Sequence, residues 1–191
     1  DSLGISKIKR YAEMFGLTEK TGIEISEATP SVSNSDAVRT SIGYGHALAP
    51  VQIARYITGI ANEGTIYNLT LLDSIRSNSG TILEQKEASV YNQITMFSNA
   101  EWAAVKKGMY NVVNTNTNSL DTLYGNLGVS VAGKTGTAQI NPSTPHHALF
   151  VSFAPYENPE ICVTVVIPNG YKSANAAYTA REVFGLYFNN E

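Results

Sequence analysis

Three strand-like runs near the C-terminus constrain the fold of this 191-residue chain more than any other feature. They read "VSVAGKTGTAQI", "HALFVSFAP" and "ICVTVVIPNG", with only the loops "NPSTPH" and "YENPE" between them. These loops are too short for the crossover that parallel strands require. The pattern therefore predicts an antiparallel meander over Val129–Gln139, His147–Pro155 and Ile161–Ile167. The next segment, "SANAAYTAREVFGLYF", predicts a helix over Ala174–Phe188 across one face of that sheet, with Ser173 as its N-cap.

Further helices are predicted ahead of the sheet, so the chain as a whole is predicted to be α+β. One amphipathic stretch ends at Gly16. A second has Pro50 at its first helical position and Gly64 beyond its end, and carries a broad apolar stripe. A third follows Ser98-Asn99-Ala100-Glu101, a capping box, and has Trp102, Val105 and Met109 spaced to pack inward. Between the last two, "TLLDSIRSNSGTILEQ" predicts a peripheral hairpin that turns at Asn78-Ser79-Gly80.

Composition limits the class of molecule. The chain is 43% apolar and 15% charged, which is typical of a folded globular domain. Its formal net charge is −3 and it has no run of Lys or Arg, so nucleic acid and membrane surfaces are not expected partners of this segment. The single cysteine, Cys162, lies in an apolar run, which favours a buried side chain over a reactive thiol and excludes a disulfide within the chain.

The tripeptide Lys-Thr-Gly occurs twice, although random placement gives roughly 0.06 occurrences in such a chain. The first copy, Lys20-Thr21-Gly22, follows a helix stop and is interpreted as a structural turn. The second, Lys134-Thr135-Gly136, lies inside a predicted strand that is poor in bulky side chains. Glycine weakens a strand, so Gly133 and Gly136 indicate a close approach to the backbone, either by a ligand or by the C-terminal helix. The sequence leaves both alternatives open.

The segments "SIGYGHALAPVQIARYITGIANEGT", "GMYNVV", "VAGKTGTAQ" and "HHALFVSFAPYENPEICVTVVIPNG", in this order, resemble the C-terminal half of the transpeptidase domain of class B penicillin-binding proteins. The signature of that group of serine acyl-transferases is S-x-x-K, then S-x-N, then K-T-G. By resemblance, residues 1–191 form a partial domain of antiparallel sheet and helices, and the first two motifs lie upstream of Asp1. Two chance lookalikes, Ser6-Lys7-Ile8-Lys9 and Ser173-Ala174-Asn175, stand in the wrong order and are rejected as catalytic.

The resemblance implies a site on the second K-T-G strand. In the family, the residue after the motif, here Thr137, contributes a backbone N–H to the oxyanion hole, and the lysine, here Lys134, supports proton transfer near the nucleophile. Strand alternation puts the hydroxyls of Thr135 and Thr137 on one face, where they can bind a substrate carboxylate. Gly136 presents no side chain to a peptide lying along the edge. Gln139 continues the Thr face, either as a substrate contact or as a solvated strand end.

The functional hypothesis is therefore part of a peptidoglycan D,D-transpeptidase that works through an acyl-serine and binds penicillin. The alternatives are a β-lactam-sensing receptor, a serine β-lactamase-like domain, or a non-catalytic module on the same fold. The expected partners are the D-Ala-D-Ala stem peptide, β-lactams and the missing N-terminal half of the domain, at the extracytoplasmic face of a bacterial membrane that an upstream segment anchors. No cofactor is expected. The pair His146-His147 is not expected to bind metal, because adjacent strand residues point to opposite faces and no acidic or Cys partner lies at ligand spacing.

Overall fold

The computed structural model describes residues 4–34, 36–115, 120–139 and 142–189. The chain divides into two compact units. The first consists of residues 1–59 and 65–94, and the second of residues 60–64 and 95–191. The second unit contains the predicted meander.

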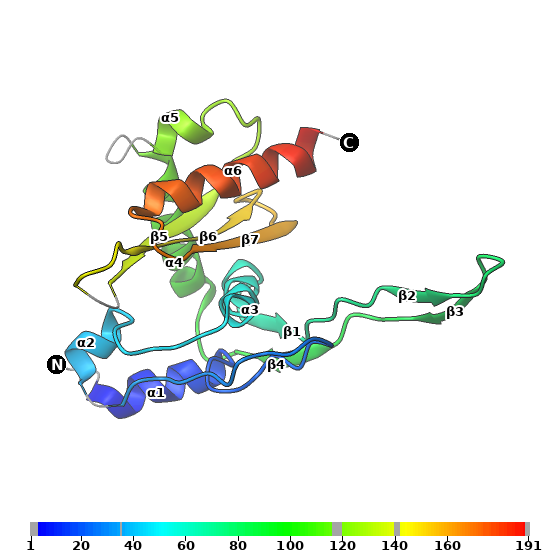
Figure 1. Cartoon of the computed structure of the whole chain (residues 1–191), viewed down its shortest axis with the longest axis horizontal. Coiled ribbons are helices and arrows are strands. Elements are labelled where there is room, and N and C mark those ends of the chain that lie inside the picture. The colour runs from blue at the N-terminus through cyan, green and yellow to red at the C-terminus, as the bar shows by residue number, and fades with distance from the viewer. Residues whose placement is uncertain (1–3, 35, 116–119, 140–141, 190–191) are drawn as a thin grey trace. The chain divides into compact units, whose positions relative to one another are not determined.

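The sheet of the second unit has the strand order β5-β6-β7 and is antiparallel throughout, which confirms the meander. Its strands are β5 (Ala132–Ala138), β6 (His147–Ala154) and β7 (Ile161–Ile167). Helix α6 (Ser173–Asn189) packs on β6 and β7 and covers one face of the sheet (Figure 1). The N-cap prediction was wrong by one position, because Ser173 is already the first helical residue.

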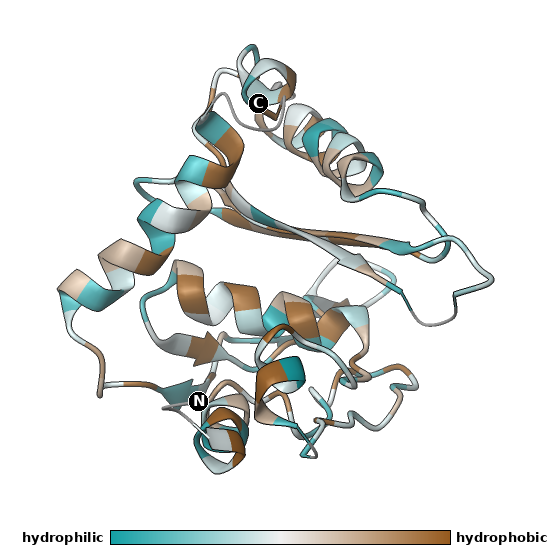
Figure 2. Ribbon diagram, turned by 90° about the vertical axis from the view of Figure 1, so that its left-hand side faces the viewer, coloured by the Kyte–Doolittle hydropathy of each residue, from teal (hydrophilic) through white to brown (hydrophobic). Residues whose placement is uncertain are grey.

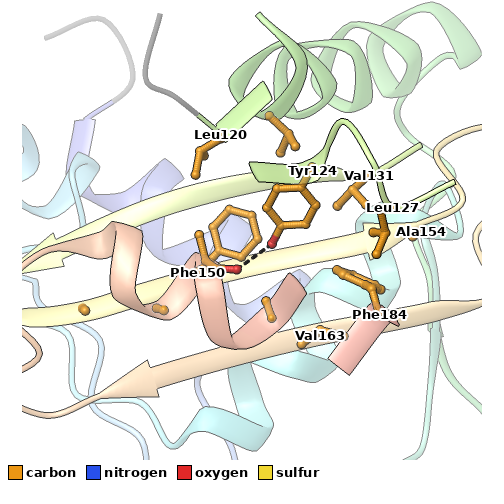
Figure 3. Packing of buried hydrophobic residues seen from close by; sticks show 13 residues of the cluster. Leu120, Tyr124, Leu127, Val131, Phe150, Ala154, Val163 and Phe184 are labelled. Carbon is orange, nitrogen blue, oxygen red and sulfur yellow. Dashed lines mark hydrogen bonds between the residues drawn. The ribbon is translucent and has the colours of Figure 1, made fainter. Parts of the chain in front are cut away.

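The core of this unit lies between the sheet and α6. Three small residues of the helix, Ala176, Ala177 and Ala180, are fully buried and let its backbone approach the strands. Figure 3 shows the rings of Tyr124 and Phe150 beside each other in this core, with their centroids 6.0 Å apart. The Tyr124 hydroxyl donates to the Ala177 carbonyl oxygen over 2.8 Å, and burial raises the pKa of this phenol. The hydrogen bond satisfies a polar group that would otherwise be costly to bury.

The predicted capping box is present at the start of α4 (Asn99–Asn114). The Ser98 hydroxyl accepts from the Glu101 N–H, and the Glu101 carboxylate accepts from the Ser98 N–H over 2.7 Å. The Ser98 hydroxyl also donates to this carboxylate over 2.7 Å, and the two hydrogen bonds from the Ser98 N–H and hydroxyl hold the pKa of the Glu101 carboxyl below its usual range. The short helix α5 (Leu120–Tyr124), which the sequence pattern did not predict, carries the core residue Tyr124.

The inward face of α4 was predicted only in part. Trp102 and Met109 are buried as expected, but Val105 is 48% exposed. The buried stripe runs through Trp102, Lys106, Met109 and Val113, and apolar bands recur along the helix in Figure 2. Lys106 takes the place expected for Val105 because its aliphatic stem packs inward while its Nζ reaches the Glu63 carboxylate at 2.9 Å.

The first unit contains α1 (Gly4–Met14), α2 (Ala37–Ser41) and α3 (Pro50–Ala61), although the last two residues of α3 belong to the second unit. Strands β1 (Thr65–Tyr67) and β4 (Val90–Gln93) form an antiparallel pair that the sequence pattern did not predict. The predicted hairpin is confirmed as β2 (Ser74–Arg76) and β3 (Ile82–Gln85), joined by a turn in which Gly80 has a φ of 85°.

A buried arginine joins three elements of this unit. Arg55 of α3 is 1% exposed, and its guanidinium donates to the Gly16 carbonyl oxygen just after α1. The same guanidinium lies 4.4 Å from the centroid of the Tyr91 ring on β4, in cation–π geometry. The predicted start of α3 at Pro50 is confirmed, but its apolar pattern gave no sign that an arginine would be among its most buried residues.

Candidate functional site

The second K-T-G motif lies in the middle of β5, an edge strand of the described sheet. Strand β6 covers one side of β5, and no strand in the described part of the chain pairs with the other side. In an edge strand, alternate backbone N–H and C=O groups point away from the paired neighbour. The motif therefore stands on a strand edge that can accept an additional extended segment.

The side chains of the motif alternate as the sequence predicted. Thr135 and Thr137 pair in register with Phe150 and Ala148, so their side chains share the α6 face of the sheet. Neither threonine hydroxyl has a hydrogen-bond partner among the described residues, so both are available to a ligand. Gln139, directly beyond the end of β5, is exposed.

Lys134 lies on the opposite face of the strand from the two threonines, in register with Val151. Its side chain is exposed, and its Nζ donates to the Thr135 carbonyl oxygen over 2.7 Å. Because a lysine ammonium has three donor hydrogens, this contact leaves donors for a second group. The strand thus carries a cation on one face and two hydroxyl groups on the other.

The two glycines of β5 differ in what surrounds them. A Cβ atom on Gly133 would lie 2.5 Å from Cζ of Phe150, whereas one on Gly136 would lie 3.2 Å from Cβ of Leu149. Gly133 is therefore required by packing inside the sheet, against Phe150 of β6 rather than against the C-terminal helix. Gly136 meets no comparable obstacle, so its lack of a side chain is not explained by packing alone.

The first K-T-G copy forms a carboxylate-binding turn in the first unit. The N–H and Oγ1 of Thr21 donate to Oε2 of Glu27 over 2.8 and 2.9 Å, and the N–H of Gly22 reaches the same oxygen at 3.4 Å. Gly22 has a φ of 81°, a left-handed conformation that favours glycine. These contacts support the predicted structural role and add Glu27, which the sequence interpretation did not include.

Other candidate residues have structural surroundings. His147 accepts a hydrogen bond on Nδ1 from the Asn169 N–H, and no group of three or more potential metal ligands gathers anywhere in the described residues. Burial raises the pKa of the Cys162 thiol to about 12, so this cysteine is no thiolate nucleophile near neutral pH. The lookalike residues Ser6 and Lys9 are both exposed on α1, and within the described chain they make no hydrogen bond to each other.

Two open hollows lie in the first unit, and neither is lined by β5. One, of about 520 Å³, lies at the base of the hairpin, where the Glu24 carboxylate is already bound by Thr70 and the Leu71 N–H. The other, of about 410 Å³, is largely apolar and lies beside α1 and α3. The candidate site is therefore a strand edge and not either of these hollows.

Comparison with known proteins decides the family. Residues 1–185 match the family described as the penicillin binding protein transpeptidase domain. The chain belongs to the penicillin-binding protein transpeptidase family. This match confirms the resemblance and, with the observed helices and antiparallel sheets, the predicted α+β fold.

The relatives of this transpeptidase-family chain are peptidoglycan enzymes and penicillin-binding proteins. It is 33% identical to the peptidoglycan D,D-transpeptidase MrdA of Haemophilus influenzae, an alignment that covers 98% of the chain and 33% of the relative. It is 28% identical to penicillin-binding protein 2B of Streptococcus pneumoniae, over 96% of the chain and 29% of the relative. The chain thus spans about a third of the length of these curated relatives.

Solved structures agree with this assignment. Penicillin-binding protein A of M. tuberculosis, in an imipenem acyl-enzyme complex, has a TM-score of 0.78 and 25% identity, covering 98% of this chain and 44% of that one. Penicillin-binding protein 2B of S. pneumoniae superimposes with a TM-score of 0.82 at 24% identity, over 98% of this chain and 33% of the other, and supports the fold. No helix among the described residues is both long and apolar enough to cross a bilayer.

Proposed function

We propose that this chain supplies the K-T-G strand of the active site of a peptidoglycan D,D-transpeptidase. The enzyme cross-links stem peptides through an acyl-serine intermediate and is acylated by penicillin. The observation that carries the proposal is the open edge of β5, which presents Lys134, Thr135 and Gly136 in a chain of the transpeptidase family. In this proposal, the nucleophilic serine and the S-x-N motif lie in a segment upstream of Asp1, so that residues 1–191 are part of a larger catalytic domain.

The substrate lies antiparallel along the free edge of β5 as an added strand. Backbone N–H groups at such an edge are fixed in place, which is what stabilisation of an oxyanion requires. We assign one of these donors to Thr137. Gly136 leaves the edge unobstructed. The atoms nearest to a Cβ placed on Gly136 belong to Leu149, which lies on β6 and not at the open side of β5.

The hydroxyls of Thr135 and Thr137 bind the terminal carboxylate of the stem peptide or the equivalent carboxylate of a β-lactam. Their shared face and their lack of partners in the described chain support this assignment. The chain itself contains a related arrangement, because the Thr21 hydroxyl and two N–H groups of the first K-T-G copy hold the Glu27 carboxylate. The tripeptide is thus able to bind a carboxylate through hydroxyl and backbone donors. Gln139 extends this contact surface.

Lys134 supplies a positive charge on the other face of β5, and by analogy with the family it lies near the nucleophilic serine of the upstream segment. There it supports proton transfer between the nucleophile and the leaving group. By analogy with the family, the partner molecules are peptidoglycan stem peptides and β-lactams, and the protein works at the extracytoplasmic face of the cell membrane with its anchor in the upstream segment. No cofactor takes part in this mechanism.

A fluorescent penicillin tests the proposal directly. The full-length protein should form a covalent adduct that survives a denaturing gel and maps to a serine upstream of Asp1. The isolated 191-residue chain should remain unlabelled. An adduct mapped to Ser6 or Ser173 would overturn the proposal, and so would a full-length protein that is folded but never labelled.

Two substitutions test the role of Thr137. Thr137→Ala keeps the backbone N–H and removes only the hydroxyl, so a moderate loss of acylation rate is expected. Thr137→Pro removes the N–H itself, and the loss of one oxyanion donor costs on the order of 10² to 10³ in rate. Proline at Ile140, which follows Gln139 in the sequence and lies outside the described residues, controls for the general effect of a proline near the strand, with folding followed by thermal melting. Equal acylation defects in the two proline variants at similar stability would contradict the oxyanion role.

A further inference from the structure

The loop between β7 and α6, residues 168–172, is fastened to the start of β6 by two hydrogen bonds. The Tyr171 N–H donates to the His146 carbonyl oxygen over 2.9 Å. The Asn169 N–H donates to Nδ1 of the His147 ring, also over 2.9 Å. The second bond is made by the form of the imidazole whose Nδ1 carries no proton, because only that nitrogen can accept. The His147 side chain thus accepts an N–H hydrogen bond of the kind that a backbone carbonyl oxygen accepts in a regular β-ladder.

The backbone of this loop depends on such external contacts. Asn169 and Tyr171 have φ values of 53° and 67°, in the left-handed region that non-glycine residues seldom occupy. A conformation of this kind persists where surrounding contacts hold it. Between them lies the buried Gly170, where a Cβ atom would approach Cβ of Ala148 to 2.8 Å. The loop is therefore pressed onto the first residues of β6.

The same residues of β6 hold the end of the K-T-G strand. His147 pairs in register with Ala138, and Ala148 pairs with Thr137. On the other side of β6, the ladder to β7 stops at Ala148, which pairs with Ile167. At His147, which pairs with Ala138 of β5, β7 therefore no longer pairs with the other side of β6. The loop contacts of His146 and His147 occupy that side instead.

We propose that His147 is a positioning residue of the transpeptidase site. Its imidazole holds residues 168–172 against the start of β6, and thereby fixes the Ala138 and Thr137 end of β5 where the substrate lies. The residue acts through the loop and the ladder and does not touch the substrate. This role rests on the proposed function, because the position of Thr137 matters for acylation only if its N–H serves the oxyanion hole.

Two nearly isosteric substitutions separate the hydrogen bond from the shape of the side chain. His147→Leu removes the acceptor, whereas His147→Asn retains an oxygen attached to Cγ, as Nδ1 is in histidine. His146→Leu is the neighbouring control, since that ring has no hydrogen bond within the described residues. Each variant is made in the full-length protein, and its acylation by fluorescent penicillin is followed over a range of concentrations.

We expect His147→Leu to lower the maximal acylation rate constant by roughly three- to tenfold, the net worth of one hydrogen bond. The penicillin concentration that gives half the maximal rate should change little, because Thr137 N–H acts mainly in the transition state. His147→Asn and His146→Leu should stay close to the wild type. The fraction of protein that can be labelled at long times, with thermal melting, corrects for any loss of folded protein.

Amide hydrogen exchange gives a readout that does not require acylation. The peptide containing residues 168–172 should exchange faster in His147→Leu than in His147→Asn. Equal behaviour of the Leu and Asn variants in both assays would overturn the role of His147, as would normal acylation in a Leu variant whose loop exchanges faster. These failures differ from that of the proposed function, in which the wild-type protein itself would not be labelled.

Discussion

The contrast between Gly133 and Gly136 yields a quantitative prediction about β5. A Cβ atom on Gly133 would lie 2.5 Å from Cζ of Phe150, 2.9 Å from its Cε2 and 3.0 Å from the Val151 carbonyl oxygen. Overpacking of this kind costs about 1–3 kcal/mol. A methyl group on Gly136 would meet only the Leu149 side chain, at 3.2 Å, where a shift of a few tenths of an ångström suffices. Its cost is offset by about 0.5–1 kcal/mol of backbone entropy that alanine saves relative to glycine.

Gly133→Ala should therefore lower the free energy of unfolding by about 1–3 kcal/mol, and Gly136→Ala should leave it nearly unchanged. Denaturant titration of the purified protein measures both. For a domain of this size, each kcal/mol also lowers the melting temperature by about 2–4 °C. The acylation rates should show the opposite ranking. When compared at equal folded fraction, Gly136→Ala should be acylated by penicillin more slowly than Gly133→Ala, because it places a methyl group beside the proposed substrate strand.

A double-mutant cycle with Phe150→Leu identifies the cause. Leucine lacks the ring atoms nearest to Gly133, so the cost of Gly133→Ala should fall by about 1 kcal/mol in that background, within the range found for residues in contact. The single change Phe150→Leu destabilises the protein by itself because it leaves a cavity in the core. Strictly additive effects, or a larger loss of stability for Gly136→Ala than for Gly133→Ala, would refute the packing explanation.

Three further outcomes are expected. Tyr124→Phe should destabilise the protein by about 1 kcal/mol in denaturant titration, because the buried hydrogen bond to the Ala177 carbonyl oxygen is lost. Cys162 is half-buried and should react with a thiol reagent much more slowly in the native protein than after unfolding, since burial raises its pKa to about 12, and equal rates in the two states would contradict this. The Ser98 hydrogen bonds hold the pKa of Glu101 below its unfolded value, so their stabilisation is present above the unfolded pKa and is lost as the pH falls through the folded pKa. The difference in melting temperature between wild type and Glu101→Ala should accordingly shrink on acidification, and a constant difference would exclude the capping role.

Local patterns in the sequence determined the meander, the α4 capping box, the start of α3 and the hairpin at Gly80. Each depends on residues close together in the chain: strand alternation with short loops, a Ser–Glu pair three residues apart, a proline in the first helical turn, a turn glycine. Alternation likewise placed Thr135 and Thr137 on one face and Lys134 on the other. The family resemblance, carried by short motifs in order, was confirmed by the match over residues 1–185. The individual roles of the site residues remain predictions.

Contacts between distant segments were decided by the tertiary structure alone. The sequence showed Gly133 as a glycine in a strand, but only the register with β6 shows that Phe150 fills the space of its missing side chain. The sequence likewise gave no sign that Lys106, and not Val105, would lie on the inward face of α4. The Glu63 carboxylate that compensates the charge of Lys106 lies 43 residues away in the chain. Helical and strand periods report which side of an element is apolar, not which group from elsewhere will meet it. The attachment of Asn169 to His147 has the same origin, since two segments 22 residues apart meet only once the sheet has formed.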